Sequence, residues 1–377
     1  MSAIFWISIT LLFCEYLIYY FAIITCSWPK HSCHNDPFAN GKPPRPPLQA
    51  IILADPHLLG KRAHWLDKLR REWQMTRSFQ TADFLHRPDV VFVLGDILDD
   101  GQNALLEDFR EDVGRFRTMF WSSAPVICAV GNHDIGFHYR IIPQLRQRFE
   151  KAFERRPVEL LEFSGIQFVL INSMAFEGDR CSMCKEAEQQ LGVVSLRLRC
   201  QRALKARTEE EQTLPKECDA VDFSRETAFS KPIILQHFPM YRLSDEACNE
   251  PDEAPADEKS QPFRGKWECI SKEATEQIMN TIEPRAVFGG HTHHGCYRKH
   301  RNGVDEWTIS SFNWRNKINP SFLMVSFCPD TLAVYKCFLP NEHTVFFTYG
   351  ASGFFLLLWL VWQVARRIRK RCKVRFD

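Results

Sequence analysis

The sequence has 377 residues, which is enough for one large domain or two modest ones, because single hydrophobic cores stop growing at roughly 250–300 residues. Its 48 basic and 46 acidic side chains leave a net charge of +2, so the chain lacks the one-signed field that dominates nucleic-acid binding, and we expect no nucleic-acid partner. Aromatic residues make up 13%, with 30 phenylalanines, and part of this excess lies in apolar runs at the two ends.

Residues 3–25 predict a transmembrane helix. The run contains one charged side chain, Glu15, and at a rise of ~1.5 Å per residue it is long enough to cross a hydrocarbon core of ~30 Å. A cleavable signal peptide is the alternative. The apolar stretch exceeds the usual h-region of about 7–15 residues, however, and no small-x-small cleavage site follows it. The sequence therefore favours a retained anchor, and the proline-rich residues 30–48 that follow predict an extended stalk.

Residues 49–340 predict a folded domain of the α/β class. Short apolar runs that end in polar or glycine-rich residues indicate buried strands at 49–54, 89–94, 125–130, 168–171, 231–235 and 285–288. Residues 64–85 and 104–121 have the apolar spacing of helices. Residues 307–312 predict another strand, and residues 322–338 predict a hairpin that turns at Pro329 and Asp330. We expect these last strands to form a second sheet packed on the first.

Fourteen cysteines suit an oxidising lumen, where thiols can pair. Residues 177–230 predict an inserted excursion that contains Cys181, Cys184, Cys200 and Cys218. A zinc site is the alternative for these four, but the second C-x-x-C of a zinc ribbon is missing, so disulfides of undetermined connectivity are favoured. Residues 244–259 are acidic and contain proline, which predicts a solvated loop.

A second apolar run at residues 344–365 predicts another transmembrane helix, and the basic residues of 366–377 follow it at once. Because positive residues beside a span stay cytosolic, we expect both termini in the cytosol and the domain between the two spans in the lumen. A merely solvated terminus, or one that contacts anionic lipid, is compatible with the same orientation.

Metal-binding residue types follow five of the predicted strands directly. The motifs are D-x-H, G-D-x-x-D, G-N-H-D, a single histidine and G-H-x-H, and their donor residues are Asp55, His57, Asp96, Asp99, Asn132, His133, His237, His291 and His293. In layered α/β sheets ligands gather beyond the carboxyl ends of strands, so we expect these turns to converge. Any one of them alone would be an ordinary turn or capping residue. Together, carboxylate, amide and imidazole donors without thiolate predict two divalent ions, of manganese, iron or zinc, that share one carboxylate.

The order of these motifs resembles that of the calcineurin-like metallophosphoesterase superfamily over residues 50–294. The resemblance implies a β-sandwich flanked by helices in four α/β/β/α layers. It implies that the first metal ion is held by Asp55, His57, Asp96 and His293. The second would be held by Asp96, Asn132, His237 and His291.

The same resemblance implies that His133 is a general acid or a phosphate contact, with Asp99 as its orienting carboxylate. Two cations neutralise the oxygens of a phosphodiester and lower the pKa of a bridging water toward roughly 7, and general-acid catalysis contributes about 10²–10⁴-fold. Protein Ser/Thr phosphatases of the superfamily have an arginine after the second motif's aspartate, where this chain continues to Asp99 and the acidic Asp100, which argues against that branch.

The two apolar ends, the C-x-x-C at the start of the insert, and residues 236–242 and 311–322 resemble a membrane-bound branch of the superfamily. Proteins of that branch are manganese-dependent and remove the ethanolamine phosphate side branch from the second mannose of GPI anchors. The resemblance therefore implies Mn²⁺, GPI-anchored proteins and their glycan as substrate, and cargo receptors as candidate partners. It also implies residence in the endoplasmic reticulum, its exit sites and the Golgi. A dilysine retrieval signal is expected in such a tail, but Arg375 replaces its second lysine, so the compartment stays open.

Two alternative functions and the role of two residues remain open at this point. A generic lumenal phosphomonoesterase or nucleotide phosphodiesterase would carry the same motifs. A metal-free binding module would have lost donors, whereas every inferred donor position here holds a competent one. Trp314 and Arg315 are suited either to stacking on and gripping a glycan phosphate or to packing at a strand end.

Overall fold

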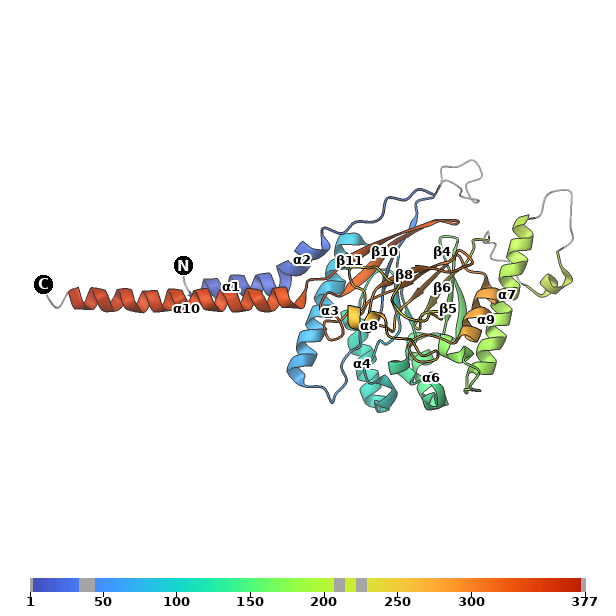
Figure 1. The fold of residues 1–377 in the computed structure, drawn as a ribbon, viewed down its shortest axis with the longest axis horizontal. Helices are drawn as coiled ribbons and strands as arrows, with labels where there is room; N and C mark the ends of the chain where they lie inside the picture. Colours follow the sequence, from blue (N-terminus) through green and yellow to red (C-terminus); the bar gives the residue numbers. More distant parts are fainter. Residues whose placement is uncertain (1–2, 34–44, 207–213, 222–228, 374–377) are drawn as a thin grey trace.

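The computed structural model describes residues 3–33, 45–206, 214–221 and 229–373 (Figure 1). Two β-sheets form its centre. The first has the order β11-β10-β1-β2-β3, and the second has the order β4-β5-β6-β7-β9-β8. The strands of the first sheet are β1 (Leu48–Leu53), β2 (Val90–Leu94), β3 (Val126–Ala129), β10 (Ser321–Phe327) and β11 (Leu332–Phe338). Those of the second are β4 (Val158–Phe163), β5 (Ile166–Ile171), β6 (Ile233–Gln236), β7 (Ala286–Gly289), β8 (Cys296–Lys299) and β9 (Asp305–Thr308).

The partition of strands between the sheets differs from the expectation. The predicted hairpin exists as β10 and β11, but it extends the first sheet, because β10 pairs antiparallel with β1 along its length from Leu48↔Phe327 to Ile52↔Leu323. In contrast, β9 pairs parallel with β7 in the second sheet. The predicted second sheet of late strands is therefore wrong, although two sheets do form.

Helices complete the fold on the outer faces of the two sheets. The longer ones are α3 (Trp65–His86), α4 (Leu106–Met119), α6 (Pro143–Phe153), α7 (Cys184–Ala206) and α9 (Lys272–Ile282), and the short ones are α5 (Asn132–Ile135) and α8 (Ala256–Lys259). Side chains alternate along each strand. Ile52 is buried between the sheets with Phe168 and Phe288, whereas Ile51 is buried with Phe79 of α3. Both faces of each sheet are thus covered, as the resemblance implies.

Helix α7 lies inside the segment expected to be an excursion. Its Leu191, Val194 and Leu198 are buried in the same hydrophobic cluster as strands β4 and β5. This helix is therefore part of the domain's packing and differs from the expectation. Its cysteines form the pairs Cys181–Cys184 and Cys200–Cys218, which confirms disulfides over a zinc site.

Two further disulfides tie the segment after the first apolar helix to the first sheet. They join Cys26 to Cys337 and Cys33 to Cys328. The beginning of the predicted stalk is therefore fastened to the domain by covalent bonds. Residues 34–44, which contain several of the stalk prolines, lie outside the described residues.

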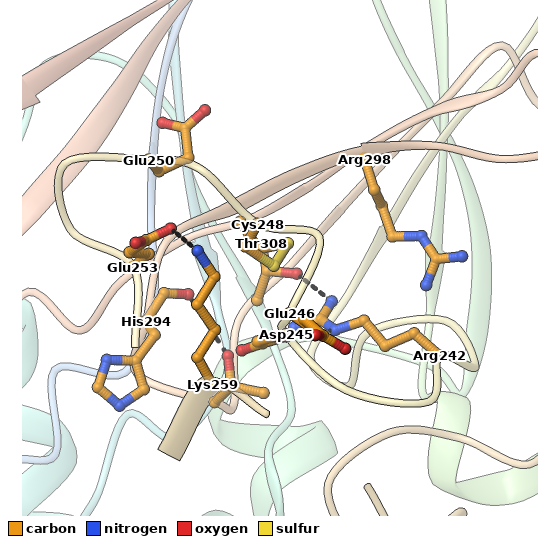
Figure 2. Close-up of a disulfide and its surroundings, with 12 residues drawn as sticks. Arg242, Asp245, Glu246, Cys248, Glu250, Glu253, Lys259, His294, Arg298 and Thr308 are labelled. Carbon is orange, nitrogen blue, oxygen red and sulfur yellow. Dashed lines mark hydrogen bonds and ion pairs between the residues drawn. A yellow bond between two sulfur atoms is a disulfide. The ribbon is translucent and has the colours of Figure 1, made fainter. Parts of the chain in front are cut away.

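The acidic loop at residues 244–259 is anchored, and the prediction of a solvated loop is wrong for two of its carboxylates. Asp245 and Asp252 are buried. Asp245 Oδ1 lies 2.7 Å from Arg242 Nε, and Asp252 Oδ1 lies 2.6 Å from Lys336 Nζ. Figure 2 shows the loop folded around the disulfide that joins Cys248 to Cys296. Ion pairs with the adjacent Arg242 and the distant Lys336 therefore compensate the burial of these two charges.

The two apolar runs are helices that lie side by side and project from the body (Figure 1). The first consists of α1 (Ala3–Leu12), a π-helical turn (Phe13–Leu17) and α2 (Ile18–Ile23), and the second is α10 (Glu342–Lys373). Trp6 Nε1 donates to Ser352 Oγ across the pair at 2.7 Å. Both are long and apolar enough to cross a membrane. Helix α10 continues beyond the predicted span through the basic residues up to Lys373.

Candidate metal centre

The five predicted turns converge at the carboxyl ends of strands from both sheets. Asp55 and His57 follow β1, Asp96 follows β2, Asn132 and His133 form the first turn of α5 after β3, His237 follows β6, and His291 and His293 follow β7. Their donor atoms form groups that fit metal ions. The sequence prediction of a single site built from distant turns is consistent with this arrangement.

The first group contains Asp55, His57, Asp96 and His293. The Nε2 atoms of His57 and His293 lie 3.0 Å apart, and Asp55 Oδ1 lies 3.8 Å from each of them. Asp55 Oδ1 is buried and has no hydrogen-bond donor, although a buried carboxylate oxygen normally needs a partner. A cation supplies that partner, so the residues fit a metal ion.

The second group contains Asp96, His237 and His291, with Asn132 beside them. His237 Nε2 lies 3.1 Å from Asn132 Oδ1 and 3.3 Å from His291 Nδ1. These oxygen and nitrogen donors match the ligand set that the resemblance implies for the second ion.

Asp96 joins the two groups. Its Oδ2 lies 3.5 Å from His57 Nε2 on one side and 3.3 Å from His237 Nε2 on the other. Its Oδ1 accepts a hydrogen bond from the backbone N–H of His133 at 2.8 Å. One carboxylate thus faces both positions, which is the geometry of a bridging ligand.

Backbone carbonyls orient two of the candidate ligand imidazoles. His237 Nδ1 donates to the carbonyl of Leu94 at 2.8 Å, and His291 Nε2 donates to the carbonyl of Trp267 at 2.6 Å. The opposite ring nitrogen of each histidine therefore faces the centre as a lone-pair donor. Spacing along the sequence gives no signal for these carbonyls.

Asp134 connects two of the motifs. Its Oδ1 accepts from the backbone N–H of Leu98 at 2.9 Å, and its Oδ2 accepts from that of Gly131 at 2.8 Å. Asp134 is the last residue of the G-N-H-D motif, and the sequence alone assigned it no role. Its fixed place after the donors Asn132 and His133 was the available signal.

Burial and neighbouring charges set the protonation of the centre. Burial lowers the pKa of His291 to about 3 and that of His293 to about 2, so both are neutral ligands at physiological pH. Burial also lowers the pKa of His237, but the adjacent Asp96 carboxylate outweighs it and raises the value to about 9. Binding of a cation there displaces a proton.

Five of the ligands have left-handed backbone. The φ angles are 53° at Asp55, 45° at His57, 47° at Asp96, 75° at His291 and 61° at His293. Such conformations cost about 1–3 kcal/mol each outside glycine and cluster at functional sites. The turns are also crowded, since a Cβ at Gly131 would lie 2.2 Å from the backbone nitrogen of Asp96.

His133 lies beside the metal groups, and its Nδ1 donates to the backbone carbonyl of Asp99 at 2.6 Å. The carboxylate of Asp99 does not serve this purpose. It lies 3.3 Å from Nδ1 of His57 and pairs with the guanidinium of Arg315. The expectation that the Asp99 carboxylate orients His133 is therefore corrected: its backbone carbonyl holds His133, and its carboxylate lies beside the candidate metal ligand His57.

Trp314 and Arg315 have different roles. Trp314 is buried and its Nε1 donates to the carbonyl of Pro340 at 2.8 Å, so it packs and does not face the centre. The side chain of Arg315 is 40% exposed beside Asp99. Burial raises the pKa of Asp99, but His57 and Arg315 outweigh it and lower the value to about 2. Because a guanidinium has several N–H donors and this side chain is partly exposed, Arg315 can also bind an anionic ligand.

A layered α/β fold with two candidate metal positions that share one aspartate is typical of a binuclear metallohydrolase. Residues 48–295 match the family model for calcineurin-like phosphoesterases, and the chain belongs to this family. It is an enzyme of the metallophosphoesterase class, whose cluster fits two divalent ions.

Curated relatives narrow the family further. Metallophosphoesterase 1 of Cricetulus griseus is 44% identical over 361 residues, which cover 94% of this chain and 88% of that protein. The protein of that name from Gallus gallus is 44% identical, covering 93% and 87%. The Drosophila melanogaster Metallophosphoesterase 1 homolog is 43% identical, covering 96% and 92%. The similarity therefore extends over most of the chain, well beyond residues 48–295, and confirms the resemblance to a branch of the family.

Proposed function

We propose that the chain is a manganese-dependent phosphodiesterase that removes the ethanolamine phosphate side branch from the second mannose of GPI anchors. In this role it supports transport of GPI-anchored proteins from the endoplasmic reticulum to the Golgi, with cargo receptors as candidate partners. Its catalytic domain lies in the lumen. The proposal rests on the resemblance in sequence together with one observation from the structure.

That observation is the short distance between the metal centre and the apolar helices. Arg315 contacts Asp99 at the centre, and its neighbour Trp314 packs on Tyr19 of α2, with ring centroids 6.3 Å apart. The guanidinium of Arg70 lies 5.1 Å from the Trp314 ring and 4.2 Å from that of Phe346 in α10. A substrate fixed in the bilayer by its lipid holds its glycan near the membrane, so a site beside the spans suits it.

Individual residues then have distinct tasks. Arg315 binds a phosphate oxygen, since a guanidinium matches the geometry of phosphate. His133 gives a proton to the departing sugar oxygen, and Asp99 holds both His57 and Arg315 in place. Bound divalent ions neutralise the phosphodiester and lower the pKa of water. Oxygen and imidazole donors also accept Fe or Zn, so the choice of Mn²⁺ rests on the resemblance.

The substrate assignment is tested with the purified full-length chain in lipid nanodiscs, supplied with Mn²⁺. We expect it to remove ethanolamine phosphate from the second mannose of a GPI intermediate, as a mass loss on that sugar. Nucleotide diesters and simple phosphomonoesters serve as competing substrates. An enzyme that hydrolyses those and leaves the glycan intact would be a generic phosphoesterase, and a chain that binds no metal would be a binding module.

Topology is tested by adding protease to intact microsomes. We expect digestion to remove only the tail after Arg366, because the basic residues hold that end in the cytosol. Immunoblots for the domain and for the tail report the two regions. Detergent-opened microsomes provide the control, in which the domain becomes accessible. Cleavage within residues 43–299 of sealed microsomes would contradict a lumenal domain.

A further inference from the structure

The first turns of α3 expose three large apolar side chains. Trp65 is 68% exposed, Leu66 is 53% exposed and Leu69 is 57% exposed. We call these three residues the α3 patch. They lie outside the two apolar runs, and α3 begins directly after the loop that carries Asp55 and His57.

The α3 patch continues a face of α3 that already packs on the apolar helices. Residues four apart lie on one face of a helix, so Trp65, Leu69, Trp73 and Arg77 are aligned. Trp73 Nε1 donates to the carbonyl of Glu15 at 3.2 Å. The guanidinium of Arg77 lies 4.6 Å from the ring of Tyr16. Trp65 and Leu69 lie on the continuation of this face, and both side chains are more than half exposed.

Contacts with the start of α10 place the first half of α3 on the side of the body from which the apolar helices project. Trp73 contacts Glu15, and His86 Nε2 lies 3.2 Å from the carbonyl of Ile23, so the second half of α3 lies beside the last turns of the first apolar segment. Figure 1 shows α3 running steeply across the axis of α10, so its first turns lie along this side of the body and do not point along the apolar helices. Arg71 Nη1 also pairs at 2.7 Å with Glu342, the first residue of α10. Figure 1 shows α3 beside the point where α10 leaves the body.

The composition of these turns matches an interfacial helix. Tryptophan and leucine on one face, flanked by lysine and arginine, are typical of helices that lie about 5–10 Å deep at the headgroup boundary. Arg62 and Lys68 provide flanking charges, whereas Lys61 pairs with Asp108 of α4 at 3.2 Å. The stems of such side chains can lie on apolar surface while their charged ends reach water.

We propose that the α3 patch inserts into the lipid headgroup region of the membrane that α1 and α10 cross. It forms a third contact with the bilayer and fixes the orientation of the catalytic domain, so that the metal centre stays near substrates in the same leaflet. The inference depends on the membrane anchoring proposed above. It does not depend on which phosphoester is cleaved.

Labelling by lipid tests the insertion directly. The full chain is placed in phosphatidylcholine vesicles that contain a lipid with a diazirine near its headgroup, and labelled peptides are mapped by mass spectrometry. We expect label in α10 and in the peptide with Trp65, Leu66 and Leu69. Trp121 is equally exposed at 68%, and its neighbour Ser122 bonds to Asp83 near the far end of α3, so its peptide should stay unlabelled.

Equal labelling of the α3 patch and the Trp121 peptide would overturn the insertion. Absence of label from α10 would overturn the anchoring and the insertion with it. Neither outcome involves the substrate, so both are distinguishable from failure of the proposed activity.

A variant tests the orientation. We expect W65S/L66S/L69S to reduce kcat/KM on a bilayer-bound phosphodiester by about tenfold, the equivalent of ~1.4 kcal/mol, and to leave hydrolysis of a soluble aryl phosphodiester unchanged. Trp121→Ser is the matched control and should change neither rate. The soluble rate also verifies that the triple variant is folded. An unchanged rate on the bilayer-bound substrate would overturn the orienting role.

Discussion

Replacing Asp96 by alanine is expected to abolish turnover and to lower bound metal from two ions to at most one. Asp96 Oδ2 faces both metal groups, at 3.5 Å from His57 Nε2 and 3.3 Å from His237 Nε2. Its removal therefore weakens both positions at once. Since metal-ion charge stabilisation is worth several kcal/mol, kcat should fall at least about 10³-fold. Metal content by mass spectrometry and single-turnover rates measure the two effects.

Asp100→Ala is the matched control, because Asp100 is an acidic neighbour whose Oδ1 accepts from Asn103 Nδ2 and faces no metal group. This variant should retain two ions and its activity. Asp96→Ala with full metal occupancy would show that the carboxylate does not bridge. Equal losses in the two variants would show that the effect comes from net charge.

The convergence of the candidate metal ligands was predictable from sequence because each follows a buried strand in the chain. A parallel strand ends at a defined edge of its sheet, so the sheet determines the position of the residue that follows. That position can be predicted without knowing any contact between distant segments. Asp55, Asp96 and His237 illustrate this, as each begins the turn directly after an apolar run. Their local pattern therefore contains both the strand and the site.

Contacts between distant segments were not predictable in this way. The hairpin joined the first sheet because β10 fits the free edge of β1, which no local pattern encodes. The carboxylate of Asp99 contacts His57 and Arg315, and these three residues come together only when the chain is folded. Likewise, the acidic loop is anchored by Lys336 and by Cys296, the disulfide partner of its own Cys248, and both partners lie far away in sequence.

His133→Asn is expected to leave both ions bound and to slow hydrolysis of the GPI side-branch diester by about 10²–10⁴-fold, the usual contribution of a general acid. Nδ1 of His133 is held by the carbonyl of Asp99 at 2.6 Å, so Nε2 is the atom left to face the substrate. Asparagine has an amide in its place, which cannot transfer a proton to the leaving group. Rates on the diester and metal content are measured together.

His64→Asn is the matched control for this substitution. His64 is an exposed histidine at the N-cap of α3, where its Nδ1 accepts from the N–H of Leu66, and asparagine is also a good N-cap residue. The variant should retain full activity on every substrate. A loss in both variants would indicate a general effect of removing imidazole.

The leaving group then distinguishes the roles of His133. A mannose hydroxyl is a poor leaving group and needs a proton as its P–O bond breaks, whereas p-nitrophenolate departs with little help. His133→Asn should therefore retain far more activity on an aryl ester than on the glycan. Equal losses on both substrates would mean that His133 stabilises charge on phosphorus in the transition state. Loss of metal would instead place His133 among the ligands, because its ring lies 4.6 Å from that of His57.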